Sequence, residues 1–179
     1  MTTTAIDTFR QTRKLLALAV QGLTAEQMLA IPTGFDNNIA WNLGHILSVQ
    51  QSLTYRLSGL PMTTTAEQNR MYRPGTSPAD WAAPPDLDEL IALIPVQGEQ
   101  LAADYAAGKF TTYQDYTTST GVRLQNVDEA IIFNTFHEGM HLGAILSLRN
   151  FVLFGGWGVL LEKPTNEFEI GYWLFVIGA

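Results

Sequence analysis

The sequence contains no cysteine. This absence excludes disulfide bonds, thiolate metal ligands and a cysteine nucleophile. It is compatible with a reducing compartment, although it does not require one.

Basic residues are also few. The chain has 10 Lys and Arg against 17 Asp and Glu, which gives a net charge of −7, and its longest basic cluster is Arg13-Lys14. Sequence-independent binding of nucleic acid needs several cations that neutralise phosphates. We therefore predict no nucleic-acid partner.

Long apolar runs are missing as well. The longest uncharged apolar stretch, 170–179, is too short to span a bilayer, which takes about 20 apolar residues. The amino terminus shows no positive region followed by an apolar run, so we expect no signal peptide. These features predict a cytoplasmic protein without a membrane partner.

At 179 residues, 46% of them hydrophobic, the chain is expected to form a single domain over 1–179. Apolar periodicity and cap residues predict helices over 3–22, 39–58 and 86–107, and a last helix capped by Asn126 or Asp128 that ends near residue 154. Pro95 predicts a kink or a break in the third of these helices. The first helix is expected to bury one stripe and expose the other side, with the buried stripe formed by Ile6, Phe9, Leu16 and Val20 and the exposed side by Arg10, Arg13 and Lys14.

The connections complete the predicted fold. Residues 61–85 form a long link with a turn of helix near 65–71, which favours a crossover over a simple up-down order. Residues 110–124 alternate aromatic and hydroxyl side chains around a glycine and predict a short extended hairpin or loop. We therefore predict an all-α four-helix bundle. The apolar tail 155–179 is expected to pack on the domain or in a dimer interface.

The sequence has three histidines: His45, His137 and His141. His137 and His141 are four residues apart in a predicted helix, where this step turns the side chain by about 40° and raises it by about 6 Å. They can therefore reach one metal ion. His45 shares an apolar stripe with Trp41, and we expect it to point inward beneath that ring.

Three neutral imidazoles around an open fourth position are typical of a catalytic metal site. Such a donor set suits Zn, Ni, Fe or Cu. The alternative is that these histidines are incidental core or helix-face residues.

The segment 137–141 also matches the H-E-x-x-H pattern of zinc peptidases. In that interpretation Glu138 activates a zinc-bound water, and a downstream residue such as Glu162 is the third ligand. Those enzymes place the motif beside a strand-rich lobe, and this sequence predicts little strand. Because Glu138 lies about 100° around the helix from His137, it can instead be a solvated carboxylate or one beside the metal ligands. The peptidase is the weaker hypothesis.

Two segments together, 38–47 (NIAWNLGHIL) and 137–145 (HEGMHLGAI), resemble the DinB-like family of metal-binding four-helix bundles. The resemblance covers most of residues 1–154. It implies that a histidine of the second bundle helix and a His-x-x-x-His pair of the last helix bind a divalent metal, usually Zn or Ni. These roles fall on His45, His137 and His141.

Related members of that family include thiol-dependent transferases and maleylpyruvate isomerase, which use a low-molecular-weight thiol as cosubstrate. The resemblance thus implies a metal-dependent transferase or hydrolase-like enzyme, in which the metal lowers the pKa of a thiol or water. A small-molecule substrate and a homodimer are the expected partners. The alternative is a bundle with a structural or sensory metal and no turnover.

Five residues are candidates for the wall of a substrate pocket. Each also has a simpler role, namely core packing, a surface ion pair or loop packing. They are Trp41, Ser52 and Arg56 on the His45 side, and Tyr113 and Tyr116 from the aromatic segment.

Overall fold

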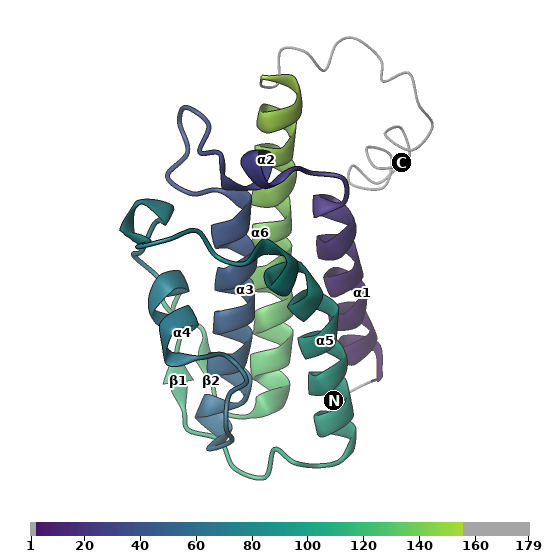
Figure 1. Ribbon diagram of the computed structural model, residues 1–179. Coiled ribbons are helices and arrows are strands. Elements are labelled where there is room, and N and C mark those ends of the chain that lie inside the picture. Colours follow the sequence, from purple (N-terminus) through teal and green to yellow (C-terminus); the bar gives the residue numbers. More distant parts are fainter. Residues whose placement is uncertain (1–2, 156–179) are drawn as a thin grey trace.

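The computed structural model describes residues 3–155, which contain six α-helices and one two-stranded hairpin (Figure 1). The predicted all-α bundle is confirmed. The predicted tail lies outside the described residues from residue 156 onward. Four long helices form the bundle: α1 (Thr3–Val20), α3 (Ile39–Thr54), α5 (Leu87–Ala106) and α6 (Val127–Phe154).

The four helices are arranged so that α6 packs between α1 and α3, and α5 packs against the same two helices. In Figure 1, α1 and α6 run in one direction and α3 and α5 in the other. The link from α3 to α5 must therefore cross from one end of the bundle to the other, as predicted. This link contains the 3₁₀ turns η1 (Arg56–Ser58) and η2 (Pro78–Asp80) and the helix α4 (Ala66–Tyr72).

Side-chain caps set the starts of the helices. The Asn38 side chain accepts the backbone N–H of Trp41 at 2.8 Å, and the Asn126 side chain accepts that of Glu129 at 2.9 Å. These bonds satisfy amides that have no partner within the first turn. The helix predicted over 39–58 ends earlier, at Thr54, and continues as η1. The short helix α2 (Ala25–Leu29) begins at a capping box on Thr24.

The hairpin before the last helix is also present. Strand β1 (Tyr116–Thr117) pairs antiparallel with β2 (Arg123–Leu124), and Tyr116 lies opposite Leu124. Leu124 is 1% exposed and packs with Leu53, Leu57 and Ala130. Leu124 therefore packs the hairpin against residues of both α3 and α6, and Figure 1 shows the hairpin at the lower left, beside α4.

The sequence predicts a kink or a break at Pro95; the break is wrong, and the kink stays a prediction. Helix α5 continues through Pro95 to Ala106. The ring is exposed, while Ile94 and Leu101 on either side of it are fully buried. Their packing holds the helix together although one backbone hydrogen bond is lost.

One residue of α1, Arg13, was assigned to the wrong side. Phe9, Leu16 and Val20 are buried as predicted, but Arg13 is buried with them at 1% exposure. On a helical wheel position 13 lies within the predicted apolar stripe, and it was assigned to solvent because arginine is rarely buried. The local sequence does not show that an acidic partner lies on another helix.

The outer face of α6 has three large apolar side chains that stay exposed: Ile132 at 57%, Phe136 at 58% and Met140 at 47%. The homodimer stays a prediction. Among the described residues, no helix is long and apolar enough to cross a membrane.

Candidate metal centre

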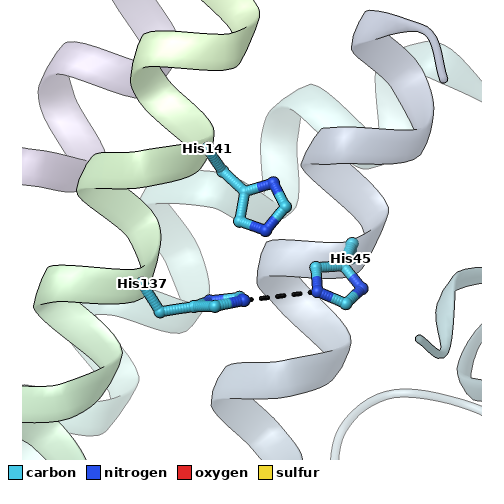
Figure 2. A group of neighbouring side chains, drawn as sticks. All are labelled: His45, His137 and His141. Carbon is cyan, nitrogen blue, oxygen red and sulfur yellow. Dashed lines mark hydrogen bonds between the residues drawn. The ribbon is translucent and has the colours of Figure 1, made fainter. Parts of the chain in front are cut away.

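The three histidines meet between α3 and α6 (Figure 2). One ring nitrogen from each lies within 4.8 Å of the others, and His45 Nε2 is 3.3 Å from His137 Nε2. Two nitrogens that each lie about 2.0–2.1 Å from a tetrahedral ion are about 3.3 Å apart. The His45–His137 spacing therefore fits two ligands of one small cation, and His141 lies close enough for the histidine cluster (His45, His137 and His141) to hold a metal ion.

The two helices bring the rings together for simple reasons. His137 and His141 are one helical turn apart on the α6 face that packs against α3. His45 points inward from α3, 5% exposed, and stacks on Trp41 with ring centroids 4.7 Å apart, as predicted.

Hydrogen bonds fix the protonation of two of the three rings. His45 Nδ1 donates to the Tyr72 carbonyl at 2.6 Å, since a carbonyl oxygen can only accept. His141 Nδ1 donates to Asn42 Oδ1 at 2.7 Å, and the Asn42 amide is held in that orientation because its Nδ2 donates to the Asn38 carbonyl at 2.8 Å. Both neutral rings therefore keep the lone pair on Nε2, the arrangement typical of metal-ligating histidine.

The third ring differs. His137 Nδ1 is buried and has no hydrogen-bond partner in the described part of the chain. Because the His45 Nε2 atom has no proton to give, the contact between the two Nε2 atoms needs the proton of His137. A metal that binds here would displace this proton from His137 Nε2.

Gly44 makes the contact to His45 sterically feasible. A Cβ atom at this position would lie 2.4 Å from the Tyr72 ring, which is 2% exposed. The missing side chain lets α4 approach α3 closely, so that the Tyr72 carbonyl reaches His45.

Burial keeps all three rings neutral. Desolvation first, and the neighbouring histidines second, lower the pKa of His141 to about 3 and that of His137 to about 4. Desolvation also lowers the pKa of His45, against the effect of its bond to Tyr72. Neutral imidazole is the form that binds metal, so at neutral pH the cluster offers its lone pairs.

Glu138 does not face the histidines. Its side chain is fully buried, and its Oε1 accepts from Arg13 Nη2 at 2.7 Å and from Asn134 Nδ2 at 2.6 Å. The expectation of a solvated carboxylate is therefore wrong. The peptidase interpretation loses its general base, because this carboxylate is fully buried and paired with Arg13 of α1. Glu162, its suggested third ligand, lies outside the described residues.

The predicted wall residues have mixed positions. Trp41 is 6% exposed and its Nε1 donates to Thr76 Oγ1 at 3.1 Å, so it is a core residue beside the cluster. The Tyr113 hydroxyl donates to the Leu53 carbonyl at 3.0 Å, which supports loop packing. Of the others, Ser52 is partly buried, whereas Arg56 and Tyr116 are exposed.

The sequence profile of the DinB superfamily matches residues 8–145, a range that contains all three histidines. The chain belongs to the DinB superfamily. A comparison with curated proteins gives no significant match. The predicted family is thus confirmed, and the DinB fold accounts for the helical bundle.

Two residues that hold the histidines in place were not predicted from the sequence. Asn42 could have been, because it precedes His45 by three positions and so shares its helix face. Tyr72 gives no sequence signal, since it contributes a backbone carbonyl that any residue has.

Proposed function

We propose that this DinB-superfamily chain is a metal-dependent enzyme in which His45, His137 and His141 hold one divalent ion. The observation that carries the proposal is the convergence of three neutral imidazoles, two of them with Nε2 left free by a bond at Nδ1. This is the donor set of catalytic zinc sites, which leave one position for water or substrate.

Zinc or nickel is the proposed ion. Imidazole ligands suit both metals, and the absence of cysteine removes the soft ligands that would favour Cu(I) or an iron–sulfur cluster. Because His137 and His141 are only partly buried, the cluster is open on one side, which favours a catalytic ion over a closed structural one.

The proposed chemistry is Lewis-acid activation. A divalent ion lowers the pKa of a coordinated thiol or water and so supplies a nucleophile at neutral pH. The chain's own residues contribute the neutral ligands and their orientation, through Asn42 and the Tyr72 carbonyl. The chain has no cysteine, so a thiol must come from a cosubstrate of low molecular weight. We therefore propose a thiol-dependent transferase as the reaction class, and a small molecule as substrate.

Metal analysis tests the first half of this proposal. Protein purified without a polyhistidine tag should contain one zinc or nickel ion per chain, and His141→Ala should lose it. Met140→Ala is the matched control, because this neighbouring side chain is 47% exposed on the outer face of α6. An ion retained in full by His141→Ala would contradict the assignment of the ligands.

A transfer screen tests the second half. The metal-loaded protein is incubated with a set of low-molecular-weight thiols and electrophilic acceptors, and loss of free thiol is followed. We expect turnover that disappears with a chelator and in His141→Ala. Stoichiometric metal without turnover on any acceptor would favour a structural or sensory ion.

A further inference from the structure

A buried ion pair joins α1 to α6, on the face of α6 that packs against α1. Arg13 Nη2 is 2.7 Å from Glu138 Oε1, and the two side chains are 2% and 0% exposed. Asn134, one turn before Glu138, donates to the same carboxylate oxygen at 2.6 Å. We call Arg13, Asn134 and Glu138 the ion-pair cluster.

The surroundings are shaped to hold Arg13. A Cβ atom at Gly98 on α5 would lie 3.1 Å from the Arg13 Cγ, so the arginine stem occupies the space of the missing side chain. The guanidinium lies 5.3 Å from the centre of the Phe9 ring. Its Nη1 reaches toward the Ile94 carbonyl at 3.4 Å. Arg13 thus links α1, α5 and α6 at one level of the bundle.

Stability is a poor explanation for this pair. Burial of two charges costs desolvation, and well-packed apolar residues often do as well or better. Within the described residues, Arg13 Nε, Glu138 Oε2 and Asn134 Oδ1 have no hydrogen-bond partner, so the compensation is incomplete. A buried pair with this cost is better explained by the single geometry that it imposes.

The position of Glu138 indicates that the geometry in question is the rotation of α6 about its axis. It follows His137 by one residue and precedes His141 by three, so it is about 100° and 60° away from them around α6. A rotation of α6 by about 20° would move an imidazole Nε2, roughly 6–7 Å from the helix axis, by roughly 2 Å. Metal–ligand distances tolerate only about 0.2 Å.

We propose that Arg13 and Glu138 are positioning residues that fix the rotation of α6 about its axis and so hold His137 and His141 in register with His45. The proposal rests on the metal site of the proposed function. Arg13 binds Glu138 from the side of α1 and α5, and Asn42 binds His141 from α3. Helix α6 is thereby held on two flanks at the level of the site.

Zinc affinity of the folded, metal-free protein tests this. The double variant Arg13→Met/Glu138→Gln removes both charges and leaves neither one unpaired, while the amide introduced on α6 can still accept the bond from Asn134. The matched control is Arg10→Met/Glu99→Gln, because Arg10 of α1 and Glu99 of α5 also form an ion pair, but at the surface. Zinc dissociation constants are measured by competition with a chelating dye, well below the unfolding temperature.

We expect the double variant to bind zinc about 10- to 100-fold more weakly than the parent, which is the range typical of residues that orient metal ligands. The visible spectrum of its cobalt form should also change, since that spectrum reports ligand geometry. The surface control should match the parent in both. Glu138→Gln alone, measured in parallel, carries the same expectation and decides the matter if the double variant does not fold.

Equal zinc affinity in the parent and in the folded Glu138 variants would overturn the positioning role and leave the metal site intact. Failure of the parent itself to bind zinc or nickel would overturn the proposed function and this inference together. The two failures are therefore distinguishable.

Discussion

Helix α6 contributes to two buried polar clusters, the ion-pair cluster and the histidine cluster, which differ in their charges. The ion-pair cluster contains charges of both signs, and its cation and its anion satisfy one another at 2.7 Å. The histidine cluster contains neutral rings whose lone pairs converge on one another. Converging acceptors repel unless a cation or proton lies between them. The ion-pair cluster thus has its opposite charges paired, whereas the histidine cluster calls for a metal ion.

The largest difference is expected when one member of each cluster is removed. Glu138→Ala should lower the free energy of unfolding by about 3–5 kcal/mol, because it leaves the Arg13 charge buried and unpaired. His141→Ala, in metal-free protein, should have a much smaller effect, since this imidazole is neutral and its loss leaves no buried charge unpaired. Urea unfolding with a chelator present measures both.

Arg10→Ala is the control for Glu138→Ala, since it removes one member of the exposed pair with Glu99 and should not measurably change stability. A loss below about 1 kcal/mol for Glu138→Ala would mean that the ion-pair cluster relaxes easily.

Metal should stabilise the folded protein only by binding to the histidine cluster. With free zinc at about 100 times its dissociation constant, we expect the free energy of unfolding to rise by about 2.7 kcal/mol. The melting temperature should rise with zinc concentration in the parent and stay constant in His141→Ala. An equal rise in both proteins would place the zinc elsewhere.

Acid should lower the free energy of unfolding of the metal-free protein through the histidine cluster. The pKa values of His137 and His141 in the folded state, about 4 and about 3, lie below the 6.5 of a free histidine. Between these values the unfolded chain binds more protons, so stability is fully present above pH 6.5 and falls as the pH drops toward 4. Each ring contributes a slope of up to about 1.4 kcal/mol per pH unit.

Unfolding free energies from about pH 7 to pH 4 measure this slope. His137→Gln and His141→Gln should each flatten it, because each removes one titrating ring. A slope that is unchanged in both variants would show that other groups cause the loss of stability in acid.

The smallest expected effect comes from the outer contact of the histidine cluster. Asn42→Ala should weaken zinc binding about tenfold, because His141 Nδ1 loses the acceptor that fixes its tautomer. Asn69→Ala is the control, since Asn69 pairs with Thr64. Unchanged affinity in Asn42→Ala would mean that water replaces the amide without loss.

The sequence predicted the features that depend on local pattern. Caps at Asn38 and Asn126 and the apolar periodicity place the helices, and the i, i+4 spacing places His137 beside His141. The convergence of His45 with that pair depends on tertiary packing, and it was anticipated through the resemblance to the DinB-like family.

The sequence failed where the outcome depends on a distant partner. Arg13 and Glu138 are 125 positions apart, and each alone resembles a surface charge. The carbonyl of Tyr72 depends on the path of the α3–α5 connection. A kink or a break was expected at Pro95, yet α5 continues through it. Local propensity does not include the packing of Ile94 and Leu101.

The central claim is that three imidazoles hold one metal ion, and anomalous diffraction from crystals of tag-free, zinc-loaded protein tests it most directly. The account predicts a single anomalous peak at the zinc absorption edge, about 2.0–2.1 Å from one nitrogen each of His45, His137 and His141. A peak that lacks any one of these three ligands, or no peak between α3 and α6, would contradict it.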